Sequence, residues 1–194
     1  MRVGVLALQG YVREHTASLT ALGVETVPVR RPEHLENLAG LIMPGGESTA
    51  IAHLLTTSGV REPLARALEA GLSVLGTCAG LILLSREVLD GRSDQWSFAA
   101  LDVAVRRNGY GRQLASFETT LEVVGLGAVP GVFIRAPKIE SWGSDVEVLA
   151  THDHGDGVFP VLVREGAVWG CAFHPELTAD TRIHELFVSS LVDR

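Results

Sequence analysis

The amino-acid sequence predicts an α/β fold, with a mostly parallel central sheet flanked by helices and a more antiparallel or mixed C-terminal half. Up to about residue 90, short apolar runs alternate with longer amphipathic segments, a pattern typical of βαβ units around a parallel sheet. Beyond that point, strand-like runs follow one another with turn residues between them and little helical periodicity. The sequence has no internal repeat or linker, so we expect a single three-layer domain over residues 1–194.

The first half divides into regularly alternating elements. Apolar runs predict strands at residues 3–8, 24–29, 41–43 and 72–75. Helical periodicity predicts helices at 11–22, 48–57 and 61–70, and a brief one at 31–38. Gly23 and Gly71 follow the first and third of these helices as C-terminal caps, and Ser48 is expected to cap the second. A further helix that begins at Leu81 is expected to continue through Glu87.

The second half reads mainly as strands. They are predicted at 101–106, 117–124, 132–134, 146–149, 158–163 and 167–173, with a loop at 91–98 and a closing amphipathic helix at 181–192. The stretch 151–160 is rich in His, Asp and Gly. Its His152-Asp153-His154 run could suggest a metal site, but the neighbouring glycines and acids favour a solvated turn. We therefore expect no metal.

Charge and composition exclude several classes of function. The net charge is −7, from 16 basic and 23 acidic residues, and no cluster of Lys or Arg indicates a nucleic-acid partner. No apolar run is long enough to span a membrane, and the N-terminus reads as a first strand rather than a signal peptide. The two cysteines lie far apart without a CxxC pair, so a reducing cytoplasm is the simplest compartment.

The stretch Gly76-Thr77-Cys78-Ala79-Gly80 lies between a predicted buried strand and a predicted helix. It is the cysteine version of the Gly-x-Ser-x-Gly nucleophile elbow, in which glycines relieve the crowding of a sharp strand-to-helix turn. A helix start also stabilises a thiolate. Cys78 is therefore a candidate nucleophile, and the alternative is a buried structural cysteine in a tight turn.

A nucleophilic cysteine needs a base, and the base needs an orienting group. His174 and Glu176 are separated by Pro175, which favours an extended backbone at His174. Residues two apart in an extended chain point to the same side, so the imidazole and carboxylate can lie together. The alternative is an incidental turn at a strand end. Four other histidines show no partner pattern: His15, His34, His53 and His184.

An oxyanion hole would complete such a site. The elbow offers the N–H of Ala79, the residue after the nucleophile. Gly45 or Gly46 could supply a second N–H, because glycine allows close approach of the backbone; the same Pro-Gly-Gly stretch also fits an ordinary turn. A phosphate-binding P-loop is disfavoured, because the Gly-Lys-Ser/Thr ending is missing.

Six stretches in this order resemble one family. They are Leu8-Gln9-Gly10, Pro44-Gly45-Gly46-Glu47-Ser48-Thr49, Gly76-Thr77-Cys78-Ala79-Gly80-Leu81, Arg107-Asn108-x-Tyr110-Gly111-Arg112-Gln113, Phe133-Ile134-Arg135-Ala136-Pro137 and Phe173-His174-Pro175-Glu176-Leu177. Together they resemble the glutaminase subunits of pyridoxal 5′-phosphate synthases, which are class I (triad) glutamine amidotransferases with a flavodoxin-like fold. The resemblance covers nearly the whole chain, and only the stretch 151–160 departs from it.

The resemblance implies a role for each matching position. Cys78 would attack the side-chain amide of L-glutamine, His174 would transfer protons and Glu176 would orient His174, with no cofactor. Gly46 and Ala79 would form the oxyanion hole. The glutamine pocket would be lined by Gly46, Glu47, Ser48, Arg107, Ile134 and Arg135. A separate synthase subunit would receive the ammonia for pyridoxal phosphate synthesis, and its docking could act through Gln9 and Gly10 at the end of the first strand.

Three other interpretations remain open at this stage. The chain could be a glutaminase that serves another synthase, such as the imidazole glycerol phosphate enzyme, although the Arg107–Gln113 stretch argues against it. It could be a cysteine hydrolase or peptidase of similar fold. It could also be a non-catalytic scaffold that binds a partner, which the complete Cys/His/Glu set disfavours.

Overall fold

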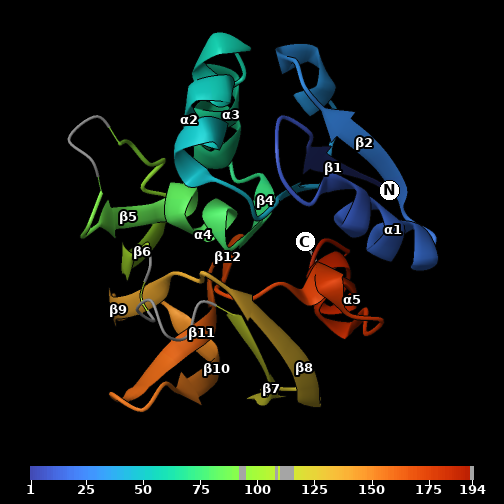
Figure 1. The fold of residues 1–194 in the computed structure, drawn as a ribbon. Coiled ribbons are helices and arrows are strands. Elements are labelled where there is room, and N and C mark those ends of the chain that lie inside the picture. The colour runs from blue at the N-terminus through green and yellow to red at the C-terminus, as the bar shows by residue number, and fades with distance from the viewer. Residues whose placement is uncertain (92–94, 108, 110–115, 193–194) are drawn as a thin grey trace.

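A seven-stranded sheet forms the centre of the protein in the computed structural model, which describes residues 1–91, 95–107, 109 and 116–192 (Figure 1). Its strands are β1 (Arg2–Leu6), β2 (Glu25–Val29), β3 (Gly40–Met43), β4 (Ser73–Thr77), β10 (Glu147–Asp153), β11 (Val158–Glu165) and β12 (Val168–Cys171). Their order across the sheet is β10-β11-β12-β4-β3-β1-β2. Neighbours from β12 to β2 pair in parallel, whereas β11 pairs antiparallel with both β10 and β12.

The remaining elements surround this sheet. A three-stranded sheet contains β5 (Ser85–Val88), β6 (Leu101–Arg106) and β9 (Lys138–Trp142), and β7 (Ser116–Val123) pairs with β8 (Gly127–Ile134) as a hairpin. The α-helices are α1 (Val12–Ala21), α2 (Ser48–Thr57), α3 (Arg61–Glu69), α4 (Ala79–Leu84) and α5 (Arg182–Ser189). Short 3₁₀ helices in the described part of the chain are η1 (Pro32–Leu35) and η3 (Pro175–Leu177). None of the helices in the described ranges is long and apolar enough to cross a membrane.

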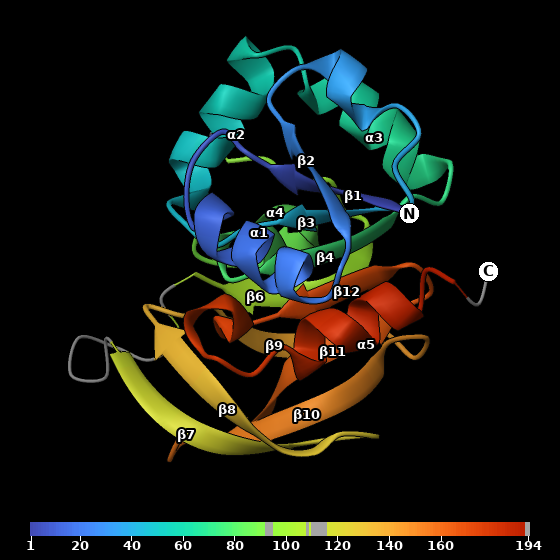
Figure 2. The same cartoon turned by 90° about the vertical axis from the view of Figure 1, so that its right-hand side faces the viewer.

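The helices form two layers because side chains alternate across each strand. At the end of β4, Gly76 faces α4, where a Cβ would lie 2.6 Å from the carbonyl carbon of Gly80. The next residue, Thr77, faces the opposite layer and contacts His15 of α1. In that layer α1 and α5 lie side by side (Figure 2), while α2, α3 and α4 lie on the other side of the sheet (Figure 1). The predicted three-layer α/β fold with its more antiparallel C-terminal half is confirmed.

Several predicted boundaries are wrong. The helix expected to run from Leu81 through Glu87 ends at Leu84, because Ser85 turns to an extended conformation and begins β5, which pairs with β6. The Ser85 hydroxyl donates to the carbonyl of Ile82 at 2.7 Å and closes the last turn. The cap of α2 is Glu47 rather than Ser48: its carboxylate accepts the N–H groups of Thr49 and Ala50, and Ser48 is already helical.

The C-terminal half also differs from the expectation in two places. Strand β9 was not predicted, because its short run mixes charged and apolar residues and depends on pairing with β6. The run His152-Asp153-His154 is not wholly a solvated turn, since Thr151–Asp153 pair with Val158–Pro160 as the ends of β10 and β11. Only the four residues between these strands form the turn. Within the described ranges no group of His, Cys, Asp or Glu side chains is arranged to hold a metal ion.

Two histidines without an apparent partner in the sequence form a buried pair. His15 of α1 and His184 of α5 are fully buried, and His15 Nδ1 lies 2.9 Å from His184 Nε2. Burial, together with the neighbouring His184 and His174, lowers the pKa of His15 well below its ordinary value. Burial likewise lowers the pKa of His184 to about 4. The pair is therefore neutral at pH 7 and joins the two helices without a charge.

This pair makes stability sensitive to acid. In the unfolded chain a histidine titrates near pH 6.5, so between about pH 4 and 6.5 the unfolded state binds more protons than the native state. The free energy of unfolding should therefore fall as pH drops through this window. Denaturant unfolding of His184→Asn should show a shallower dependence than the wild type. His53→Asn, on the exposed face of α2, is the matched control and should leave the pair's contribution in place; equal slopes in all three proteins would contradict the assignment.

Candidate active site

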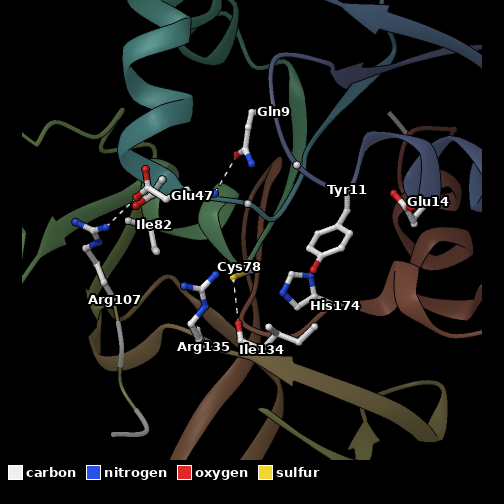
Figure 3. Close-up of a pocket in the computed structure, with 13 residues that line it drawn as sticks. Gln9, Tyr11, Glu14, Glu47, Cys78, Ile82, Arg107, Ile134, Arg135 and His174 are labelled. Atoms are coloured by element: carbon white, nitrogen blue, oxygen red, sulfur yellow. Dashed lines mark hydrogen bonds and ion pairs between the residues drawn. The ribbon is translucent and has the colours of Figure 1, made fainter. Parts of the chain in front are cut away.

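The carboxyl ends of β1, β3 and β4 meet at one edge of the sheet, as expected for parallel neighbours. A cavity of about 530 Å³ opens there (Figure 3). It is lined by Gln9, Gly10, Tyr11, Glu14, Gly46, Glu47, Ser48, Cys78, Ile82, Arg107, Ile134, Arg135 and His174. The structure thus brings most of the predicted site residues to one cavity. Ala79 and Glu176 do not line it, but Ala79 directly follows Cys78 and Glu176 contacts His174.

Cys78 occupies a strained turn between β4 and α4. Its φ of 47° lies in the left-handed region, where a residue other than glycine is rarely found without a functional reason. Its N–H donates to the carbonyl of Cys171 at 2.8 Å, which ties the turn to β12. The turn also needs Gly80, where a Cβ would lie 2.0 Å from the carbonyl oxygen of Met43. Cys78 therefore has the conformation of a nucleophile elbow and is only 6% exposed.

His174 and Glu176 lie together, although for a different reason than the sequence suggested. The backbone after His174 turns into η3 instead of continuing as a strand, and this tight turn brings the Glu176 carboxylate back to the Nδ1 side of the imidazole. His174 Nδ1 lies 2.7 Å from Glu176 Oε1, and both side chains are buried. The N–H of His174 donates to the carbonyl of Val132 at 2.8 Å, and the ring of Tyr11 packs edge-on against the imidazole.

The environment of His174 favours its protonated form. Burial alone would lower the pKa of His174, but hydrogen bonds and charge interactions with Cys78 and Glu176 outweigh it and raise the pKa to about 9. An imidazolium beside a cysteine sulfur is the arrangement in which enzymes hold a reactive thiolate. The sulfur also lies 3.9 Å from the carbonyl oxygen of Ile134.

Gly45 and Gly46 pass close to these groups. A Cβ on Gly45 would lie 2.4 Å from the His174 ring, so only glycine fits there. The Gly45 N–H donates to Thr77 Oγ1 at 3.0 Å, and its carbonyl accepts the N–H of Tyr11 at 3.1 Å. Because the peptide is planar and trans, the N–H of Gly46 points away from Tyr11. The orientation of this peptide therefore depends on the loop that follows β1.

The loop after β1 also holds the residue that follows Gly46. Gln9 Oε1 accepts the N–H of Glu47 at 2.9 Å, and Gly10, with φ 103°, approaches so closely that a Cβ would lie 1.9 Å from the carbonyl oxygen of Gly45. The Glu47 carboxylate caps α2 and lies 3.2 Å from Arg107. Partial burial would raise the pKa of Glu47, but the amides of Thr49 and Ala50 and the charge of Arg107 lower it below its ordinary range.

The two arginines of the predicted pocket have different surroundings. Arg107 is not a free surface side chain: it is 19% exposed and its guanidinium donates to Gln95 and Glu47 at 2.8 and 3.2 Å. Arg135 is exposed and has a positive φ of 43° at the turn that follows β8. Its neighbour in sequence, Ile134, lines the cavity. Both cationic groups can therefore face an anionic part of a ligand.

Some contributors were not identified from the sequence. Tyr11, Glu14 and Ile82 line the cavity, yet the sequence shows them only as ordinary helix residues. Their positions just after Gln9-Gly10 and Cys78 are the one signal that could have found them. The remainder of the Arg107–Gln113 stretch, Asn108 and residues 110–113, lies outside the described residues.

Proteins of similar sequence indicate the family of this chain. The sequence matches the SNO glutamine amidotransferase family over residues 5–193. A relative from Mycobacteroides abscessus, named pyridoxal 5′-phosphate synthase subunit PdxT, is 52% identical over 96% of this chain and 95% of its own length. A relative of the same name from Corynebacterium jeikeium is also 52% identical, over 100% of this chain and 98% of its own.

Solved structures agree with the sequence relatives. A crystal structure described as a glutamine amidotransferase superposes with a TM-score of 0.91 at 49% identity and covers 98% of both chains. The structure of PurLQS from Thermotoga maritima shares the fold, with a TM-score of 0.69 at 18% identity over 98% of both chains. The chain therefore belongs to the SNO glutamine amidotransferase family.

Proposed function

We propose that this chain hydrolyses L-glutamine to L-glutamate and ammonia, and supplies the ammonia to the synthase subunit of pyridoxal 5′-phosphate synthase. One observation carries the proposal: Cys78, on a strained elbow, lines the same cavity as His174, and His174 Nδ1 lies 2.7 Å from the Glu176 carboxylate. Relatives about 50% identical over nearly their whole length, which are named pyridoxal 5′-phosphate synthase subunits, support the same assignment.

The arrangement supports acyl transfer through a thioester. His174 takes the Cys78 thiol proton as the sulfur attacks the side-chain amide carbon of glutamine, and it gives this proton to the nitrogen as the C–N bond breaks and ammonia leaves. His174 then takes a proton from the water that attacks the thioester and returns it to the sulfur as the C–S bond breaks, which releases glutamate and restores the thiol. Glu176 accepts the His174 Nδ1–H throughout, which leaves Nε2 for the proton transfers.

The pocket residues suit an amino acid with a carboxylate and an amide. Arg107 or Arg135 would bind the carboxylate, and the N–H groups of Gly46 and Ala79 would stabilise the oxyanion. Glu47, Ser48 and Ile134 would form the walls. A cytoplasmic location fits this role, and the two free cysteines, both buried, fit a reducing compartment.

We further propose that docking of the synthase partner switches on the site through Gln9 and Gly10. These residues contact the loop that carries Gly45 and Gly46, and Tyr11 bonds the carbonyl of Gly45. A partner that docks on this loop could therefore turn the Gly45–Gly46 peptide, which has no Cβ to resist the change. One oxyanion-hole donor contributes roughly 3–4 kcal/mol of transition-state stabilisation.

The nucleophile can be tested by labelling. An electrophilic glutamine analogue should modify Cys78 and spare Cys171, which is fully buried and whose pKa is raised well above its ordinary value, mainly by burial. Cys78→Ala should abolish ammonia release while the circular dichroism spectrum is retained, and Cys171→Ala is the matched control that should remain labelled. Mass spectrometry that finds the label on Cys171 would overturn the assignment.

The partners of Cys78 should contribute unequally. His174→Asn removes proton transfer and should lower kcat by about 10²–10⁴-fold. Glu176→Gln leaves the base in place with a poorer orientation, so it should retain more activity than His174→Asn. Ammonia release measured with saturating synthase subunit tests the order, and wild-type rates in both variants would refute the triad.

Activation by the partner should depend on the contact between the first loop and Glu47. Gln9→Ala removes the acceptor of the Glu47 N–H and should reduce the increase in kcat that the synthase subunit produces, with a smaller effect on KM for glutamine. Gln9→Glu keeps an oxygen at the same place and is the matched control. Turnover at saturating glutamine, with and without the synthase subunit, is the measurement; full activation of Gln9→Ala would exclude the proposed route.

A further inference from the structure

Four buried polar side chains form a cluster outside the cavity, which contacts His174 through Glu176 and adjoins Cys78 through Thr77. They are His15 on α1, Thr77 at the end of β4, Glu176 on η3 and His184 on α5, and all are at most 5% exposed. A buried polar group destabilises the fold unless it is hydrogen-bonded, so the positions of the protons in this cluster are constrained.

His15 contacts every other member of the cluster. Its Nδ1 lies 2.9 Å from His184 Nε2, and its Nε2 lies 3.1 Å from Thr77 Oγ1 and 3.5 Å from Glu176 Oε2. Glu176 uses its other oxygen, Oε1, for His174. One ring nitrogen of His15 therefore faces the carboxylate that orients the proposed base, while the other faces α5.

The unpaired atoms of the cluster decide the tautomers. Glu176 Oε2 and His184 Nδ1 are buried and have no hydrogen-bond partner among the described residues. A proton on His15 Nε2 points at Thr77 Oγ1 and at Glu176 Oε2, both of which can accept it. His15 Nδ1 then accepts the Nε2–H of His184, and only a lone pair remains unpaired at His184 Nδ1.

The opposite tautomers, with protons on His15 Nδ1 and His184 Nδ1, are less favourable for two reasons. They would bury an N–H at His184 Nδ1 without an acceptor in the described part of the chain, and buried donors without a partner are the rarer defect in proteins. They would also turn a lone pair of His15 toward the Glu176 carboxylate. Because burial keeps His15 neutral, its ring has a single N–H, and the carboxylate is the group that most needs it.

We propose that His15 is a positioning residue for glutamine hydrolysis: as the neutral Nε2–H tautomer, it turns its N–H toward the second oxygen of Glu176, 3.5 Å away, and thereby restrains the orientation of His174. The inference rests on the proposed function, since it concerns the same site. A carboxylate that faces a donor at each oxygen is restrained from rotating away from the imidazole, and small errors in the position of a catalytic base lower rates strongly.

The same N–H reaches the loop that carries the proposed oxyanion donor. Thr77 Oγ1 lies between His15 Nε2 and the N–H of Gly45, at 3.1 and 3.0 Å. A displaced His15 would therefore disturb Thr77 and Glu176 together. The effects of His15→Leu and Thr77→Val on kcat should be non-additive for this reason, as expected for residues in one hydrogen-bond network.

Two substitutions of His15 separate positioning from packing. His15→Leu fills the space without a donor, whereas the side-chain amide of His15→Gln can place an N–H near the position of Nε2. With saturating synthase subunit, His15→Leu should lower kcat roughly ten- to hundredfold, as when an outer-shell partner is lost elsewhere, with little change in KM. His15→Gln should recover most of the loss. Ser18→Ala, at a buried position of the same helix, is the control for packing of α1 and should retain wild-type kcat.

The tautomer is measured on the wild-type protein, which avoids any failure of a variant to fold. Nitrogen-15 NMR of the histidine side chains at pH 7 should find the His15 proton on Nε2. In a folded His15→Leu variant the titration of His174 should shift, and in His15→Gln it should stay near that of the wild type.

The outcomes distinguish this inference from the proposed function. Absence of ammonia release by the wild type with saturating synthase subunit would overturn the function, while the NMR result would still show which ring nitrogen of His15 carries the proton. A proton on His15 Nδ1 would overturn the inference even if glutamine is hydrolysed. So would wild-type kcat in His15→Leu, or equal losses in the folded Gln and Leu variants.

Discussion

The strained backbone of Cys78 is the constraint on which the rest of the site depends. A positive φ at a residue with a Cβ is maintained only where its neighbours leave no alternative. Here β4 is tied to β12 by the bond between the Cys78 N–H and the Cys171 carbonyl, and α4 begins immediately afterwards. The missing Cβ atoms of Gly76 and Gly80 allow α4 to pack against β4 and β3. The sulfur is therefore held in one place before any ligand arrives.

Around this fixed point, segments distant in sequence are joined by short polar contacts. The loop after β1 bonds the loop after β3 through Gln9 and Tyr11, and the segment between β12 and η3 brings His174 to the cavity that Cys78 lines. Glycine at positions 10, 45 and 46 makes these approaches possible, because a Cβ at any of them would overlap a neighbour. The proposed chemistry and the proposed partner response would thus share one edge of the sheet.

Prediction succeeded where a local pattern decides the structure. The alternation of apolar strands and amphipathic helices was sufficient for the parallel half, and the parallel order brings the predicted loops to one edge. Prediction failed where pairing between strands decides the structure. Ser85–Val88 continues a helical run in sequence but forms a strand because β6 is available beside it. The cap of α2 is Glu47 and not the predicted Ser48, because the carboxylate of Glu47 accepts the N–H groups of both Thr49 and Ala50.

The sequence by itself determined the family resemblance, through six short stretches, and the elbow at Cys78, which lies within five consecutive residues. It also placed His174 near Glu176, although the turn into η3 rather than an extended strand brings the two side chains together. Tertiary structure alone decided the surroundings of Glu176. His15 and His184 are 169 positions apart and show no pattern in the sequence, yet the packing of α1 against α5 places them in contact. Their burial removes their charge, and the second ring nitrogen of His15 faces Thr77 and Glu176. Such an interaction depends on burial and three-dimensional proximity, which no local run of residues encodes.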